Sequence, residues 1–172
     1  LDVLADLFGS DWARIAADEA RHFRLLEARM AELGAAYGDF DAHNGLWDMA
    51  CKTAHDGLTR MALVPRVLEA RGLDVTPAMI ERLRAVGDIA SIEVLDVILR
   101  EEVDHVAAGT RWFEWCCARE RCEPASTFQR LLDLHAPDAV RPPFNEQARL
   151  AAGFTAIELE QLAARSARLR TA

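Results

Sequence analysis

Apolar residues recur at helical spacing along an unbroken stretch from Asp88 to Arg119. At about 3.6 residues per turn, one face of this stretch collects mostly apolar side chains. Its members are Leu95, Leu99, Glu102, His105, Val106, Gly109, Trp112 or Phe113, and Cys116. The pattern predicts one long helix, capped by Asp88, with this face in a core. Glu102 and His105 lie in the middle of the face.

A second stretch has the same character. After Gly9 ends a short apolar fragment, Ser10 or Asp11 can cap a helix that runs to Leu33 and stops at Gly34. Its apolar stripe consists of Trp12, Ile15, Ala16, Glu19, His22, Phe23, Leu26, Met30 and Leu33. Glu19 and His22 therefore take the same places on this stripe as Glu102 and His105 on the other.

The rest of the chain is also predicted to be helical. The pattern predicts a helix from Leu46 to Arg71, kinked at Pro65, and then a short helix from Pro77 to Val86 with Thr76 as its N-cap. Further short helices are expected at 125–135 and 146–153, separated by a proline-containing extended segment, and a last one after Thr155. Few β-branched runs and abundant Ala, Leu, Arg and Glu favour an all-α fold. We expect one domain over residues 1–172.

Composition and charge narrow the function. The net charge is −8, which weighs against a nucleic-acid partner, because such proteins usually carry a basic face. No apolar run approaches the roughly 18 residues that a membrane span requires, and no signal peptide is visible. The four cysteines form no Cys-x-x-Cys pair, so they are expected to pack in a reducing compartment rather than bind zinc. These features favour a cytoplasmic protein.

The two Glu-x-x-His pairs are the candidate chemistry. Burying an unpaired carboxylate is costly, and a metal ion bound by the carboxylate and the imidazole removes that cost. Chance alone predicts roughly 0.4 such pairs from 14 Glu and 5 His in 172 residues, so two pairs are a mild excess. The alternative is two histidines that only hydrogen bond to neighbours on their own helices. The position of both pairs mid-helix on apolar stripes favours the metal.

A further ligand would come from the helix that lies between these two in the chain. Glu69 closes the apolar stripe of that helix, although an exposed Glu69 beside Arg66 and Arg71 is about equally consistent with the sequence. Glu101 and Asp104 flank the second pair and are expected to be solvated or to orient His105. Carboxylate and imidazole ligands suit iron or manganese.

Several segments together resemble a bacterial ferritin-like family that is known only as a domain of unknown function. They are Asp18–Phe23, Tyr37–Phe40, Lys52–Asp56, Met61–Pro77, Glu101–Val106 and Arg141–Asn145. The resemblance covers nearly the whole chain and is most specific from Met61 to Pro77.

The resemblance implies a ferritin-like four-helix bundle with extra C-terminal helices and a site for two iron or two manganese ions. The implied ligands are Glu19, His22, Glu69, Glu102 and His105. One feature departs from the superfamily pattern. That pattern has a Glu on a first helix, whereas no Glu precedes Glu19 here, and Leu1–Phe8 is at most the end of such a helix.

The resulting functional hypothesis is an oxygen-dependent oxidoreductase, similar to a hydroxylase, that acts on an organic small molecule. The alternatives are a protein that binds or stores metal without turnover and a helical protein with a degenerate site. The sequence leaves the substrate, the identity of the metal and the existence of a homodimer open.

Overall fold

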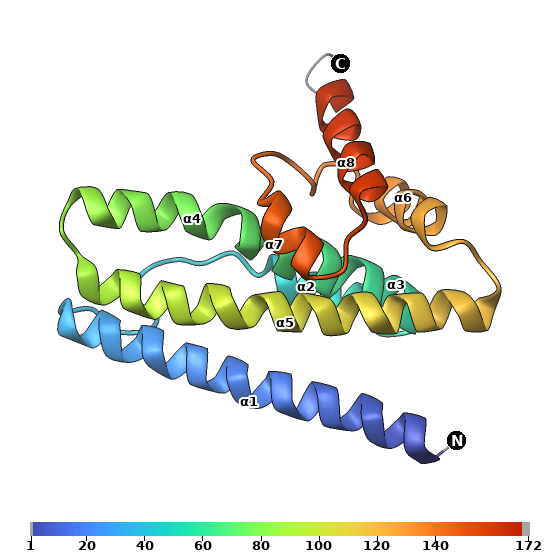
Figure 1. Cartoon of the computed structure of the whole chain (residues 1–172). Coiled ribbons are helices and arrows are strands. Elements are labelled where there is room, and N and C mark those ends of the chain that lie inside the picture. The colour runs from blue at the N-terminus through green and yellow to red at the C-terminus, as the bar shows by residue number, and fades with distance from the viewer. Residues whose placement is uncertain (1, 170–172) are drawn as a thin grey trace. The chain divides into compact units, whose positions relative to one another are not determined.

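The computed structural model describes residues 2–169, and every regular element in this range is helical. In chain order the elements are α1 (Asp2–Glu32), α2 (Gly45–Lys52), α3 (Gly57–Leu63), the π-helix η1 (Val64–Glu69), α4 (Ala70–Ala85), α5 (Ile89–Glu120), α6 (Pro124–His135), α7 (Glu146–Ala151) and α8 (Ala156–Leu169) (Figure 1). The all-α expectation is therefore confirmed, while the ferritin-like bundle stays a prediction. Over the described range, no helix has both the length and the apolar character needed to cross a membrane.

The chain divides into two compact units. One comprises α1, the loop that follows it to His43, and the segment Ile80–Glu101; the other comprises Asn44–Met79 and the chain from Glu102 onward. The single-domain organisation expected from the sequence stays a prediction.

In the first unit, α1 is a continuous helix that passes through Gly9, so the predicted break there is wrong. No atom lies within 4 Å of an added Cβ at Gly9, and a long helix tolerates the cost of one glycine, about 1 kcal/mol. At the other end Gly34 adopts a φ of +79° and Ala35 N donates to Met30 O, so the predicted stop is confirmed.

Charged contacts attach α1 to the start of α5. Arg29 donates to Asp88 at 2.8 Å and to Ser91 Oγ at 2.9 Å, and Arg21 donates to Glu101 at 2.6 Å. Residue numbers increase along α1 while they decrease along α5, so the two segments run antiparallel. On α1, Ile15 and His22 are buried, whereas Phe23 and Leu26 are 45% and 42% exposed.

The segment expected to be one helix from Leu46 to Arg71 is broken in the structure. Residues 53–56 leave the helix, and Asp56 then caps α3 by accepting hydrogen bonds from Leu58 N and Thr59 N. Pro65 does not produce a simple kink; it lies in the first turn of η1. Proline has no N–H to donate, which removes one α-helical hydrogen bond and is compatible with the wider π-helical turn.

The predicted helix end at Arg71 and the predicted N-cap at Thr76 are also wrong, because α4 continues through both residues and through Pro77. The Thr76 hydroxyl donates to Gly72 O at 2.8 Å instead of capping a new helix. The later elements agree with the prediction: α6 and α7 lie in the expected segments, and the chain between them is not helical.

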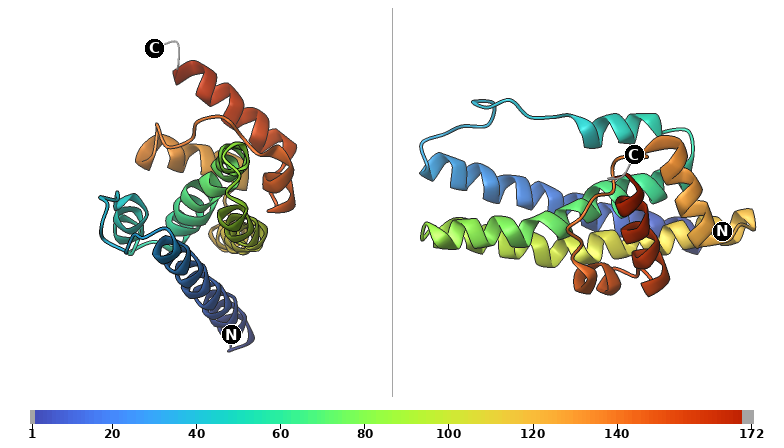
Figure 2. Two further views of the ribbon diagram at one scale, coloured as in Figure 1. Left: turned by 90° about the vertical axis from the view of Figure 1, so that its left-hand side faces the viewer. Right: turned by 90° about the horizontal axis from the view of Figure 1, so that it is seen from above.

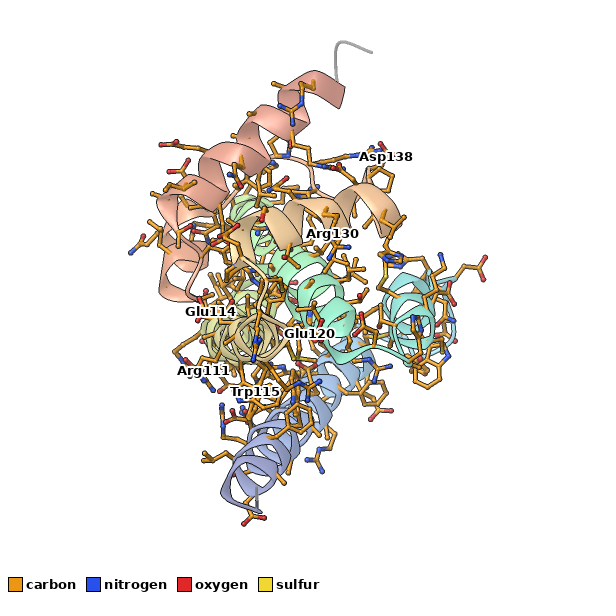
Figure 3. The ribbon with its side chains drawn as sticks, turned by 90° about the vertical axis from the view of Figure 1, so that its right-hand side faces the viewer. Arg111, Glu114, Trp115, Glu120, Arg130 and Asp138 are labelled. Carbon is orange, nitrogen blue, oxygen red and sulfur yellow. The ribbon has the colours of Figure 1, made fainter. Side chains whose placement is uncertain are left out.

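The core of the second unit is aromatic. Phe113 of α5 and Phe128 of α6 are fully buried, and Phe154, which precedes α8, is 3% exposed. Phe128 makes edge-on ring contacts with both of the others. In this unit the chain passes from α6 through α7 to α8 (Figure 2). Arg165 of α8 donates a hydrogen bond to Asp133 of α6. On the solvated surface, Glu114 projects from α5 and Arg130 from α6 (Figure 3).

The helices η1 and α5 approach each other closely at Gly109. A Cβ built on Gly109 would lie 2.3 Å from both Cβ and Cγ of Pro65. We therefore expect Gly109→Ala to lower the free energy of unfolding by about 1–3 kcal/mol, because α5 and the proline must move apart. Urea denaturation measures this. Gly72→Ala is the matched control in a helix, since no atom lies within 4 Å of its Cβ, and an equal loss in both variants would contradict the argument.

Candidate metal centre

On α1, Glu19 and His22 lie one turn apart. The His22 side chain is buried, at 4% exposure, whereas that of Glu19 is 49% exposed. The Nδ1 atom of His22 lies 3.7 Å from Oε1 of Glu19. This separation is too long for a hydrogen bond. It matches two ligand atoms on a single ion, which lie roughly 3 to 4 Å apart when each is about 2 Å from the metal.

The other nitrogen of His22 has a carboxylate partner. His22 Nε2 lies 2.7 Å from Oε2 of Glu101, and Arg21 donates to the same oxygen at 2.6 Å. Arg21 also binds Asp18 at 2.8 Å. The hydrogen bond from Arg21, together with that from His22, lowers the pKa of Glu101.

These contacts determine which nitrogen of His22 is available to a metal. An ionised carboxylate only accepts hydrogen bonds, so Nε2 of His22 carries the proton and donates it to Glu101. In a neutral imidazole the lone pair is then on Nδ1, which is the nitrogen nearest to Glu19. A carboxylate that holds the far nitrogen of a histidine in this way is the usual arrangement behind a metal-binding imidazole.

The pair on α5 repeats the geometry of the pair on α1. Nδ1 of His105 lies 3.8 Å from Oε2 of Glu102; the His105 side chain is fully buried and that of Glu102 is 15% exposed. As in the first pair, the imidazole presents Nδ1 to the carboxylate one turn before it. The predicted placement of both pairs mid-helix is confirmed.

The structure contains a cluster of Glu and His side chains that could hold a metal ion. Glu19, His22, Glu102 and His105 each offer one ligand atom, and these atoms lie within 4.8 Å of one another. Two carboxylates and two neutral imidazoles fit a divalent cation such as Fe²⁺ or Mn²⁺, and no thiolate belongs to the group. The donor set thus suits a metal, while the identity of the metal stays open.

The fifth predicted ligand, Glu69, is placed separately. It is the last residue of η1 and is half-buried, so the alternative of an exposed Glu69 is wrong. It is not a member of the four-residue cluster. Its role as a ligand stays a prediction.

Glu101 has a role that the sequence reasoning missed. It was expected to be solvated or to orient His105 on its own helix, but it contacts His22 of α1, and Asp104 is exposed. One signal was present: successive residues of a helix point about 100° apart, so Glu101 and Glu102 project in different directions from α5.

We expect Glu101→Gln to weaken metal binding by about 10- to 100-fold, because the amide no longer fixes the proton on Nε2 of His22 or neutralises Arg21. Equilibrium titration with Mn²⁺ measures the change. Asp104→Asn is the matched control, since it removes an exposed carboxylate from the same turn of α5. Equal affinities in the two variants would show that Glu101 has no special part.

Comparison with known proteins places the chain in a family. Residues 2–160 match the family described as "Protein of unknown function (DUF455)". An uncharacterized protein of Haemophilus influenzae is 44% identical over 153 residues, which cover 89% of this chain and 53% of that protein. The chain therefore spans about half the length of this curated relative. No solved structure matches the chain. On this evidence the chain belongs to the DUF455 family of proteins of unknown function.

Proposed function

We propose that the protein binds two iron or two manganese ions through Glu19, His22, Glu69, Glu102 and His105 and uses them in the oxygen-dependent oxidation of an organic small molecule. The observation that carries the proposal is the clustering of four ligand atoms of the right types, with both imidazoles almost fully buried. The resemblance to ferritin-like proteins supports a site of this class. The family match neither assigns a reaction nor opposes one.

The residues around the site have different roles. His22 and His105 supply neutral donors that are held away from water, since their side chains are 4% and 0% exposed. Glu101 keeps the proton of His22 on Nε2, and Arg21 balances the charge of Glu101. Glu19 is half exposed, so its side of the cluster is accessible to a small molecule from solvent. The bound metal would supply the redox chemistry.

The decisive experiment adds ferrous iron to the metal-free chain without oxygen and then admits oxygen. We expect oxygen uptake of the same order as the bound iron, together with a new near-ultraviolet absorbance band. The Glu102→Gln/His105→Gln variant is the control for iron that reacts in free solution. Oxygen uptake no faster than in that control would contradict an oxidase role.

A second function is favoured by one observation. The cluster contains four ligand residues, which is sufficient for one ion, and Glu69 is not among them. The alternative is therefore a protein that holds a single ion without oxygen chemistry. Elemental analysis after growth in iron-rich medium separates the two, because the first function requires close to two metal ions per chain and the second requires one.

A further inference from the structure

Arg66 is a charged residue in an unusual place. It lies on η1, three residues before Glu69, and is 1% exposed. Its guanidinium carbon lies 4.7, 4.4 and 4.5 Å from the ring centroids of Phe113, Phe128 and Phe154. Burial lowers the pKa of Arg66, and the nearby carboxylate of Glu158 partly offsets this effect.

Glu158 connects Arg66 to the beginning of α8. Arg66 Nη2 donates to Oε1 of Glu158 at 2.6 Å, and both side chains are buried. The other oxygen, Oε2, accepts from the backbone N–H and the hydroxyl of Thr155 at 2.9 and 3.0 Å. Glu158 N in turn lies 3.2 Å from Thr155 Oγ1, which completes a capping box. The Glu158 carboxylate thus caps the N-terminus of α8 and also binds Arg66 of η1.

General stability does not explain such a pair. Replacing a buried ion pair by apolar side chains of similar volume is often neutral or stabilising, because the desolvation penalty disappears. In some proteins a buried ion pair instead specifies one packing arrangement over alternative ones. The choice between arrangements is important at η1, because a π-helical turn is an uncommon variant of the α-helix. A shift of the helical register by one residue would redirect every side chain that follows it.

The register of η1 determines where Glu69 points. Pro65 packs on Gly109 of α5. In Figure 1, α3 lies over the later turns of α5, and the chain runs from α3 through η1 towards earlier residues of α5. Residue numbers therefore rise along α3 and η1 while they fall along α5. From the contact of Pro65 with Gly109 and this antiparallel direction, we infer that Glu69, four residues beyond Pro65, lies opposite the turn of α5 that precedes Gly109, which contains His105.

We propose that Arg66 is a positioning residue for the metal centre: by anchoring η1 to Glu158 at the start of α8, it fixes the register in which Glu69 meets α5 beside His105. This role rests on the proposed function, because it treats Glu69 as a ligand. It adds that the C-terminal helix α8, which contributes no ligand, helps to build the site.

The test compares two double variants of the full chain. Arg66→Met/Glu158→Gln removes the proposed anchor and keeps the capping contact through the glutamine amide. Arg149→Met/Asp74→Asn removes the other buried Arg–carboxylate pair of the same unit, which joins α4 to α7 and does not involve η1. Mn²⁺ affinity is measured from the signal of free Mn²⁺, and amide hydrogen exchange of residues 67–70 is measured without metal.

We expect Arg66→Met/Glu158→Gln to weaken Mn²⁺ binding at least tenfold and to speed exchange in η1 at least tenfold. Arg149→Met/Asp74→Asn should leave both near the values of the unchanged chain. Equal losses in the two variants, or unchanged affinity in the first, would overturn the positioning role alone. If the unchanged chain binds no Mn²⁺, the proposed function fails and this role fails with it. Glu158→Gln alone, which leaves the buried guanidinium of Arg66 without its counter-charge, should shift both readings in the same direction.

Discussion

Replacement of both Glu102 and His105 by glutamine is expected to abolish transition-metal binding by the chain. The pair supplies half of the four-residue cluster, and His105 is its fully buried imidazole. Glutamine keeps the polarity and approximate size of both side chains but removes the anionic carboxylate and the basic nitrogen. We expect the metal content after growth with excess iron to fall below about one tenth of an ion per chain, as measured by elemental analysis.

The matched control is Glu93→Gln/His135→Ala. It removes one exposed carboxylate from α5 and one exposed imidazole from the end of α6, and neither residue belongs to the cluster. The control should retain the metal content of the unchanged chain. Comparable retention by the Glu102→Gln/His105→Gln variant, with a normal helical circular-dichroism spectrum, would eliminate the cluster as a metal centre.

The second large effect is expected at the buried pair of Asp74 and Arg149. Two hydrogen bonds of 2.9 and 2.7 Å join the guanidinium to the two carboxylate oxygens, and Asn145 N donates to one of them. The side chains are 0% and 2% exposed. Asp74→Asn leaves a buried guanidinium without its counter-charge, so we expect the free energy of unfolding to fall by about 3–5 kcal/mol.

A double-mutant cycle measures the coupling between the two residues. Adding Arg149→Met to Asp74→Asn removes the uncompensated charge and should recover about half of the lost stability in urea denaturation. If the two losses simply add, the ion pair contributes nothing beyond its separate side chains. The cycle also measures the stability of the Arg149→Met/Asp74→Asn variant, which is the control for the Arg66→Met/Glu158→Gln variant.

The helices that carry the two pairs were predictable because their apolar stripes are long and regular. In α5, one face with Val106, Trp112, Phe113 and Cys116 is buried as the spacing indicated. The break before α3 was hidden because apolar spacing continues across it, although Asp56 before Gly57 was a capping signal. No local pattern separates a π-helix from a kinked α-helix at Pro65, since tertiary contacts decide between them.

The same contrast applies to the site. The two Glu-x-x-His pairs follow from spacing within single helices, which sequence periodicity reports directly. The contact of Glu101 with His22 joins residues 79 positions apart, and the cage around Arg66 is formed by three rings that are distant in the chain. Such contacts depend on how helices pack, so a single sequence supplies the participants without their pairing.

The uneven exposure of the cluster has a consequence for how its metal would be exchanged. The Glu19 side chain is 49% exposed to solvent, while the two imidazoles are buried. A chelator, or a carrier that delivers metal, could therefore bind an ion from the side of Glu19 before either histidine dissociates from it. Exchange would then proceed without unfolding, and the ion found in the protein would follow the supply of free metal in its surroundings as much as the intrinsic preference of the ligands.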